Sequence, residues 1–547
     1  MDWSKKMKKI LKFRTKIEAI VAVSILIAVS IGSVFAVRTI TDSSDTIYTT
    51  ITNSKGNSWT ATGANFYLAY YDLNSTNGGW VEAPGNLTLT KPVNLVNYTE
   101  IRGYGVNNTI FYRANGWDDT MFVAGWNGHD AAGPGGPTSG RHHIKMTGIT
   151  FDGNNVSNTW TQYSFIIGLS ANTNNITFRD CLFRRSLSDC IWTWRFAGQT
   201  TGLENIIVDA CTFIDTEKYV GDYPAGVFVG GRFFKITNSH FIDCWGSGVA
   251  FESNSASNYY CRDNIVQGCT MTGETATGVW MENGDGSNNT VMGNLIHNLN
   301  SSCYAHAGIA AANRAYAKPI LCGQDGSIII GNRIENVTDY GIVMGGARSI
   351  CSDNIIMNVI GGHVDNSYRG MGIYILAPIS YSDIHHNTII GHTAYGIVTS
   401  TSATVTNNAI DHNIIVGGTR GISLNGVNNN TIKDNQIAGS SSYGISSNNG
   451  RSLMISNNKI TGCTPGLKFT GTNKWLTVIG NDVANNTGTI TYTTSPTDST
   501  IALNLGSPSM TLPIYPPAYY VAGSMAVNIT TGDIAVYSGA AWIWTHG

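Results

Sequence analysis

The chain has 547 residues, of which only 12% are charged, and a formal net charge of −2. No basic block follows the first 20 residues, which disfavours a nucleic-acid partner because such binding needs clustered Lys and Arg. Hydrophobic residues make up 42% of the chain, so a sizeable core can be buried. The length, the 62 glycines and the many Asn, Ser and Thr residues favour a repeat array over one compact globule.

Residues 1–36 have the pattern of a targeting segment. Basic residues precede an apolar run at 19–36 that ends in Val34-Phe35-Ala36, which is typical of a cleaved signal peptide. An uncleaved membrane anchor is the alternative, because the run is nearly long enough to span a bilayer. In both cases we expect the rest of the chain to be secreted or held at the cell surface, with membrane contact only through this segment. Twelve Asn-x-Ser/Thr triplets would then permit glycosylation.

Residues 37–94 are predicted to form an N-terminal cap. They are rich in Thr and Asn and carry an aromatic patch from Trp59 to Tyr71. A cap is needed because the open first coil of a solenoid exposes an unpaired edge.

A repeated apolar-x-x-Asn-x-apolar pattern dominates residues 95–483. The last steps between its Asn residues are 22, 23 and 23 residues. A side chain at such a corner can hydrogen-bond its neighbour on the next coil, so we expect a ladder of stacked amides in which the Asn tolerates the left-handed conformation. The column Asn residues are Asn264, Asn294, Asn332, Asn354, Asn387, Asn413, Asn435, Asn458 and Asn481, and Cys181, Cys211 and Ser239 take the same position earlier in the chain.

A second pattern, Gly-apolar-x-apolar, keeps step with the first. In the regular coils the Gly follows the Asn by eight or nine residues, as in Asn413 to Gly421. Two short strands per period, each alternating inward apolar and outward polar residues, bury their apolar faces only when coils stack. The pattern therefore predicts an all-β, parallel β-helix of about a dozen coils. Its glycines are Gly226, Gly248, Gly278, Gly308, Gly341, Gly372, Gly396, Gly421, Gly444 and Gly466.

The cysteines fit the core of this predicted fold. Cys261 and Cys351 lie at the inward position three residues before a column Asn, about three coils or roughly 14 Å apart, which is too far for a disulfide. We expect most of the ten cysteines to fill the core. Cys303 and Cys322, which share one insertion, are the pair to test as a bridge.

These repeats resemble the pectin-lyase-like right-handed parallel β-helix superfamily, with repeats of the parallel β-helix and periplasmic copper-site type. The segments at 92–105 and 148–153 are similar to first coils of that superfamily, and the resemblance covers about 390 residues. It implies a right-handed β-helix. It does not imply one activity, because the superfamily includes lyases, hydrolases, epimerases, viral spikes and non-catalytic surface proteins.

The C-terminal region is predicted to contain a linker and a small module. Residues 484–520 are rich in Thr, Ser and Pro, and 521–547 predict a β-hairpin that turns at Thr531-Gly532-Asp533. This hairpin is similar to C-terminal modules of phage tail and surface-fibre proteins. The alternative is a hydrophobic C-terminal cap.

Large aromatic and acidic residues gather on one outer face of the predicted solenoid. Positions two and four after each Gly point outward, and we take Trp192, Trp194, Phe228, Trp280 and Tyr374 as candidate substrate-binding residues. The coil after Trp280 is expected to place Ala310 outward, and beyond Tyr374 the face is expected to become small and bland. Lengthened connections add His306 and Arg369 to the binding set, together with Glu274, His363, Asp365 and Tyr368. Aromatic rings, acids and an Arg on a rigid scaffold suit a sugar chain.

Glu252 and Glu282 are the candidate catalytic pair. They occupy the same outward position on neighbouring coils, so their backbones are expected to lie about 4.8 Å apart. Paired carboxylates at about 5 Å suit retaining glycoside hydrolysis, and the repulsion between them raises one pKa as a general acid requires. The alternative is that both are solvated surface residues.

Other family signatures are missing from the sequence. An Asp-Asp pair stands at Asp118-Asp119, but the rest of the polygalacturonase set (Asn-Thr-Asp, Gly-His-Gly and Arg-Ile-Lys) does not occur, and no acid cluster suits the calcium of a lyase. His385, His386 and His412 fall at corners of two adjacent coils, where surface histidines are favoured over a metal site. We expect no cofactor and no metal.

Two hypotheses follow from the sequence. One is an exported β-helix that binds a polysaccharide or cell-surface glycan on the aromatic face, with or without cleaving it. The other is a non-catalytic surface protein, such as an adhesin, sheath or spike component, that forms trimers or fibres.

Overall fold

A computed structural model describes residues 50–547, except for 77, 125–139, 159–163, 171, 195–202, 217–223, 253–260, 274–276, 282–285, 300–317, 362–369, 377–378, 401–404, 489, 495, 503, 505–524, 528–533, 538–541 and 546–547. The targeting segment predicted at 1–36 lies outside the described residues. Within them, no helix is both long and apolar enough to cross a membrane.

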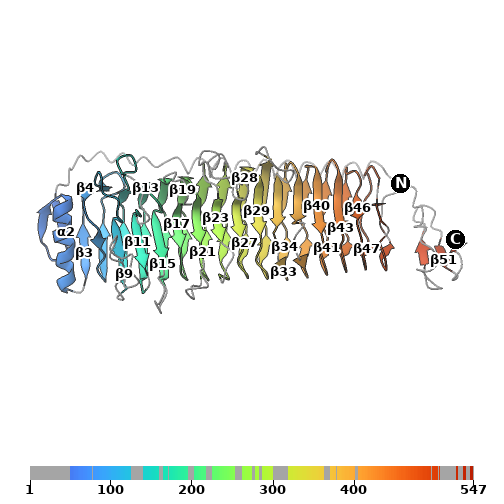
Figure 1. Ribbon diagram of the computed structural model, residues 1–547, viewed down its shortest axis with the longest axis horizontal. Helices are drawn as coiled ribbons and strands as arrows, with labels where there is room; N and C mark the ends of the chain where they lie inside the picture. Colours follow the sequence, from blue (N-terminus) through green and yellow to red (C-terminus); the bar gives the residue numbers. More distant parts are fainter. Residues whose placement is uncertain are drawn as a thin grey trace, which may run out of the picture. The chain divides into compact units, whose positions relative to one another are not determined.

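The chain enters the fold through a small mixed unit beside the first coil (Figure 1). Strands β1 (Thr50–Asn53) and β2 (Ser58–Thr60) pair antiparallel, and helix α2 (Gly63–Asp72) is followed by the short 3-10 helix η1 (Leu73–Thr76). The hydroxyl of Thr62 starts α2 by accepting a hydrogen bond from the backbone N of Asn65 at 3.1 Å. Phe66 and Tyr70 are fully buried, and the Phe66 ring lies 4.7 Å from that of Phe111 on the first coils.

Each coil contributes one strand to each of three parallel sheets, which we call A, B and C (Figure 1). Sheet A consists of β3 (Gly79–Glu82), β6 (Thr99–Arg102), β9 (His142–Thr147), β12 (Asn174–Arg179), β15 (Glu204–Asp209), β18 (Lys235–Thr237), β21 (Ile265–Gln267), β24 (Thr290–Met292), β27 (Ile328–Ile330), β30 (Ile350–Ser352), β34 (Asp383–His385), β38 (Ala409–Asp411), β41 (Thr431–Lys433), β44 (Met454–Ser456), β47 (Thr477–Ile479) and β49 (Thr500–Ala502), with β1 and β2 at its first edge. Sheet B consists of β4 (Gly85–Leu89), β7 (Thr109–Arg113), β10 (Thr150–Asp152), β13 (Leu182–Ser186), β16 (Thr212–Thr216), β19 (His240–Cys244), β22 (Thr270–Thr272), β25 (Leu295–His297), β28 (Arg333–Thr338), β31 (Ile355–Ile360), β35 (Thr388–Ile390), β39 (Ile414–Val416), β42 (Gln436–Ala438) and β45 (Lys459–Thr461). Sheet C consists of β5 (Val93–Asn94), β8 (Phe122–Ala124), β11 (Ile167–Ser170), β14 (Ile191–Trp194), β17 (Ala225–Val229), β20 (Ser247–Phe251), β23 (Thr277–Met281), β26 (Lys318–Cys322), β29 (Tyr340–Met344), β32 (Met371–Ile375), β36 (Tyr395–Thr399), β40 (Arg420–Asn425), β43 (Tyr443–Asn448), β46 (Leu467–Thr470) and β48 (Ile490–Tyr492).

The parallel β-helix predicted from the repeats is confirmed, but each coil has three strands and not two. The Asn corner separates sheet A from sheet B, so one predicted strand is in fact two. Parallel pairing also extends beyond 95–483, from β3 at one end to β49 at the other. A short extra sheet pairs β33 (Ile379–Ser380) with β37 (Val405–Thr406).

Strands β50 (Met525–Val527), β51 (Ile534–Tyr537) and β52 (Trp542–Thr545) form an antiparallel sheet near the C-terminus. The turn predicted at Thr531-Gly532-Asp533 lies outside the described residues.

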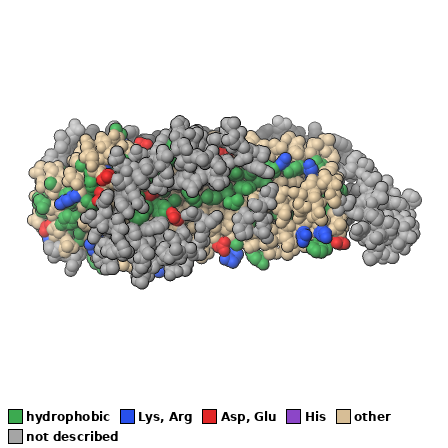
Figure 2. Space-filling view, in the orientation of Figure 1, with side chains coloured by type: hydrophobic (Ala, Val, Ile, Leu, Met, Phe, Trp, Pro, Cys, Tyr) green, Lys and Arg blue, Asp and Glu red, His purple; other side chains and the backbone are tan. Residues whose placement is uncertain are grey.

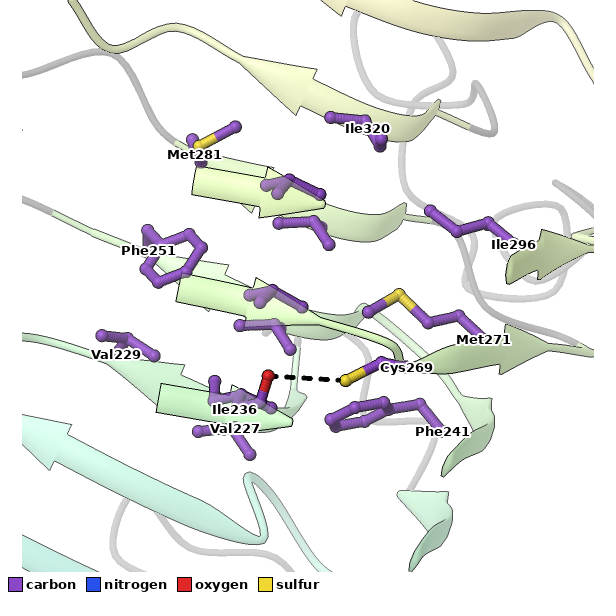
Figure 3. Packing of buried hydrophobic residues seen from close by; sticks show 14 of the residues in the cluster. Val227, Val229, Ile236, Phe241, Phe251, Cys269, Met271, Met281, Ile296 and Ile320 are labelled. Atoms are coloured by element: carbon purple, nitrogen blue, oxygen red, sulfur yellow. Dashed lines mark hydrogen bonds between the residues drawn. The ribbon is translucent and has the colours of Figure 1, made fainter. Parts of the chain in front are cut away.

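The core is one continuous column of inward side chains (Figure 3). On sheet B, residues on successive strands pair in register and are almost fully buried. This column consists of Leu87, Phe111, Phe151, Phe183, Phe213, Phe241, Met271, Ile296, Ile334, Ile356, Ile389, Ile415, Ile437 and Ile460. Stacking therefore removes from water the apolar faces that no single coil could bury.

The amide ladder is confirmed from Asn294 to Asn481 and continues to Asn504. Each Nδ2 group donates to the Oδ1 atom of the next coil at 2.8–3.0 Å. The prediction that Asn264 belongs to this ladder was wrong, because the backbone of Cys269 donates to Asn294 and takes that position. Asn264 instead starts a second ladder by donating to Asn289.

The left-handed corner residue is the one before the ladder Asn, which corrects the predicted conformation. Asp434 has a φ of 56° and Asn457 a φ of 55°, while the ladder residues that follow them are not left-handed. Gly293, Gly331 and Gly480 take the same position on other coils. The ladder Asn therefore points its amide inward while its predecessor makes the turn.

The described cysteines are free and buried. Cys351 is fully buried three coils after Cys261, as expected of core residues. Burial raises the pKa of the Cys269 thiol to about 12. Cys303 lies outside the described residues, and Cys322 is a free buried thiol, so the pair is not bridged.

Candidate functional site

Outward residues on sheet C stack in register from coil to coil. Strand pairing places Trp192 opposite Phe228, Ala250 opposite Trp280, and Val343 opposite Tyr374. Strands in a sheet lie about 4.8 Å apart, so these side chains form a continuous row along the stack. The row consists of Trp192, Phe228, Ala250, Trp280, Leu321, Val343, Tyr374 and Val398.

The coil after Trp280 differs from its prediction. Gly308 and Ala310 lie outside the described residues, and the strand that pairs with β23 is β26, which sets Leu321 opposite Trp280. Pro319 occupies the position of the repeated Gly, so the Gly pattern could not locate this strand. The row remains apolar at this coil.

Ring contacts support the row at both ends. The indole of Trp192 stacks on Phe165 with ring centroids 4.5 Å apart and an interplanar angle of 5°. The Tyr374 ring stacks on Tyr340 at 5.3 Å. Trp192, Phe228, Trp280 and Tyr374 are each half-buried, so part of every ring faces outward.

A second outward column was missed by the sequence reasoning. The residue before each repeated Gly also faces out, because the Gly itself lies against the core: a Cβ atom on Gly396 would lie 2.5 Å from a methyl group of Ile415. The Tyr-Gly pairs that recur in the sequence could have revealed this outward column. This column consists of Tyr340, Met371, Tyr395, Arg420 and Tyr443.

The two columns pack into an apolar cluster outside the core. Tyr340, Val343, Met371, Tyr395 and Val398 are buried there, and Leu321, Tyr374 and Leu376 pack against them. Figure 2 shows hydrophobic side chains gathered in a strip along the coils. The positions after each Gly predicted a small and bland face beyond Tyr374. The apolar cluster shows that this prediction was wrong.

The same face becomes cationic in the last coils. The guanidinium carbon of Arg420 lies 4.7 Å from the ring centroid of Tyr395 and 5.3 Å from that of Tyr443. The Nζ atom of Lys468 lies 5.5 Å from the Tyr443 ring. Ser446 donates from its hydroxyl to Ser423 at 3.2 Å, and Ser423 lies 3.3 Å from the Tyr443 hydroxyl.

The candidate acids are only partly described. Glu252 follows β20 directly and is half-buried, and its backbone N donates to the carbonyl of Val229 at 3.2 Å. Glu282 lies outside the described residues, so the carboxylate pair stays a prediction.

The candidates from the long connections also lie outside the described residues. They are Glu274, His306, His363, Asp365, Tyr368 and Arg369. For Trp194 only the strand position is described. The structure thus brings together Trp192, Phe228, Trp280 and Tyr374 in one row.

The corner histidines meet on the outside, away from sheet C. His386 and His412 stack with ring centroids 4.9 Å apart, and Nδ1 of His385 lies 2.8 Å from Nδ1 of His386. His412 also lies 3.5 Å from a carboxylate oxygen of Asp411. Within the described part of the chain, no group of three His, Cys, Asp or Glu could hold a metal ion.

Two family models match the chain. The model for a right-handed β-helix region matches residues 225–410, and that for the periplasmic copper-binding protein NosD matches 403–501. Comparison with curated protein sequences gives no match.

Solved structures share the fold at low sequence identity. The tailspike protein of Escherichia coli bacteriophage HK620, in complex with a pentasaccharide, is 13% identical, with 80% of this chain and 76% of that chain covered and a TM-score of 0.50. The catalytic unit of a Streptomyces thermodiastaticus α-1,3-glucanase is 12% identical (81% and 67% covered, TM-score 0.42). The A-module of an Azotobacter vinelandii mannuronan C-5 epimerase is also 12% identical (82% and 95% covered, TM-score 0.32).

The stacked three-sheet coils, the matching family models and the shared fold agree with one another, and the chain belongs to the right-handed parallel β-helix superfamily.

Proposed function

We propose that this protein binds a polysaccharide along the outer face of sheet C. One observation carries the proposal. Among the strands of sheets A, B and C from β13 to β49, every Trp, Phe or Tyr that faces outward belongs to sheet C, and the strands of sheets A and B have none. Aromatic faces stack on sugar rings, and a row in which aromatic residues alternate with smaller apolar ones along the coils suits a polymer that extends along the stack.

The surroundings of the row fit the same ligand. Toward the C-terminal coils the row continues with Ser423 and Ser446, whose buried hydroxyls bond to each other and lie beside that of Tyr443. The apolar cluster supplies a flat surface on which sugar rings can stack. Connections carried by a rigid scaffold are where further binding groups commonly lie, and the predicted binding residues His306 and Arg369 belong to lengthened connections in the sequence.

The test is a glycan array followed by affinity measurement on the best ligand. Trp280→Ala should weaken binding by about tenfold, or about 1.4 kcal/mol, because it removes one stacking ring. Trp475→Ala is the matched control, since Trp475 is 53% exposed and lies outside sheet C. Equal affinity of wild type and Trp280→Ala would contradict the proposal.

Cleavage is a separate part of the proposal, with Glu252 and Glu282 as its acids. The wild-type protein should cleave the glycan that it binds and so generate new reducing ends. Glu252→Gln or Glu282→Gln should each abolish this cleavage, because the two carboxyl groups act together. Glu335→Gln on sheet B is the control. Full cleavage activity in both variants would exclude Glu252 and Glu282 as the catalytic acids. If the wild type releases no reducing ends, the protein binds the glycan without cleaving it. If no glycan binds and the chain assembles into trimers or fibres, the structural alternative is correct.

A further inference from the structure

We infer that the C-terminal part of this face, from Tyr395 to Lys468, holds the acidic groups of the polysaccharide, so that its ligand is an anionic glycan. The inference rests on the proposed function and names the class of its ligand. It begins from two cations on one face. Arg420 lies on β40 and Lys468 on β46, two coils further, or roughly 10 Å along the stack.

Both cations are positioned by the same aromatic ring. Tyr443 lies between them, 5.3 Å from the guanidinium carbon of Arg420 and 5.5 Å from Nζ of Lys468. Arg420 is also held by Tyr395 on its other side at 4.7 Å. Cations held in this way lose little conformational entropy when a ligand arrives, which favours binding.

Neither cation is neutralised by the described part of the chain. Strands β36, β40, β43, β46 and β48 contain no Asp or Glu, and the chain has no Glu after Glu335. Neither Arg420 nor Lys468 forms an ion pair with a described residue, and the Nε atom of Arg420 is buried without a hydrogen-bond partner there. Several arginines on other coils differ: Arg179 pairs with Asp209, Arg232 with Glu204 and Arg348 with Asp325.

An anion is the partner that this arrangement lacks. A guanidinium and an ammonium bind carboxylate or sulfate through charge-assisted hydrogen bonds. Two cations are too few for a nucleic-acid footprint, which favours a glycan with spaced acidic groups.

The experiment compares three polymers: dextran as the neutral probe, dextran sulfate as the sulfate probe and hyaluronan as the carboxylate probe. We expect the full-length protein to bind at least one anionic polymer more tightly than dextran, and to lose affinity as salt rises. Arg420→Gln and Lys468→Gln should each weaken that binding by about tenfold. The anionic polymer that binds more tightly shows whether the protein prefers carboxylate or sulfate.

Lys459→Gln is the matched control. Lys459 is exposed on β45, in the same coil as Lys468 but on sheet B, and its replacement changes the net charge equally. Arg420→Lys keeps the charge and should keep more affinity than Arg420→Gln, and thermal melting verifies that each variant is folded.

Unchanged affinity in the double variant Arg420→Gln/Lys468→Gln, or equal loss in Lys459→Gln, would overturn the inference. If the array ligand is neutral and still depends on Trp280, the proposed function stands and this inference fails. If neither the array nor the three polymers yield binding, both fail.

Discussion

The coils before and after β25 share one backbone fold but fill it differently. In the earlier coils the inward column of sheet B contains Phe183, Phe213 and Phe241, and the corner next to it contains Cys181, Cys211 and Ser239. The column changes first, to Met271 beside Cys269, and the next coil has Ile296 in the column and Asn294 at the corner. Phenyl rings thus occur beside small corner side chains and branched aliphatics beside amides, with one intermediate coil between the two regions.

The two regions are also held together by different interactions. The earlier coils stack phenyl rings nearly parallel, with centroids 4.8 Å apart for Phe183–Phe213 and 4.7 Å for Phe213–Phe241. The later coils join buried amides by hydrogen bonds between Asn residues. The same stacking of backbones thus accepts either dispersion or hydrogen bonding along its axis.

The largest effect is expected from breaking the amide ladder. Asn435 accepts from the backbone and side chain of Asn413, and donates to Asn458 and to two backbone carbonyls. Asn435→Ala leaves several of these buried groups unpaired, so we expect a loss of about 3 kcal/mol or more in the free energy of unfolding. Urea denaturation monitored by hydrogen exchange in the later coils would measure it.

Asn428→Ala is the control for this ladder prediction. Its side chain is exposed on the same coil as Asn435, and its loss should change stability by less than about 0.5 kcal/mol. Similar losses for Asn428→Ala and Asn435→Ala would show that the ladder adds no special stability to the later coils.

A smaller effect is expected from exchanging the core residues of the two regions. Ile437→Phe should cost about 1 to 3 kcal/mol, because the later coils have no room for a ring. Ile437 is 1% exposed and the ladder residue two positions before it, Asn435, is fully buried, so a larger side chain has to displace its neighbours. Thermal melting compared with the wild type would measure the cost.

The reverse exchange, Phe213→Ile, should cost about 1 to 2 kcal/mol through a cavity and two lost ring contacts. A stabilised Ile437→Phe variant would contradict the joint filling of core and corner.

The regular region was the part most readable from sequence. Asn413, Asn435 and Asn458 recur at nearly equal steps, so periodicity alone predicted the coils and the ladder. The sequence did not reveal the boundary between sheets A and B, because the corner between them is too short to contain a recognisable turn motif. Its one special feature is a left-handed residue such as Asp434, which in the sequence looks like any surface Asp. Asn264 was misplaced because two corners of one coil present the same local pattern.

The candidate face was predictable where alternation holds and not where it breaks. Trp192, Phe228, Trp280 and Tyr374 were placed outward by alternation after the Gly. Tyr395, Arg420 and Tyr443 were missed because alternation breaks at each Gly: the Gly lies against the core, and the residue before it faces outward. Arg420 and Lys468 meet the tyrosine rings of neighbouring coils. Because the number of residues per coil varies, the sequence alone does not show which residues of two coils are neighbours.

The smallest effect concerns a titratable group in the later, regular coils. His392 is 2% exposed, and burial lowers its pKa below the ordinary value near 6.5. Its Nε2 atom donates to the carbonyl of Arg420 at 3.0 Å, and Nδ1 is buried without a partner among the described residues, so a second proton would create an unpaired buried charge. The folded state therefore favours the neutral form of this imidazole.

The unfolded chain takes up that proton as pH falls through about 6.5, while burial disfavours the same protonation in the folded chain. The free energy of unfolding therefore decreases as the pH is lowered through this window. The loss should approach about 1 kcal/mol at pH 5.5 relative to pH 7.5. His392→Gln cannot titrate and should reduce this difference, which parallel urea melts of both proteins at the two pH values would show. Hydrogen exchange should place the loss in the coils around β39 and β40. An unchanged pH dependence in His392→Gln would assign acid sensitivity elsewhere, for example to His240 in the earlier coils, whose pKa is also lowered by burial.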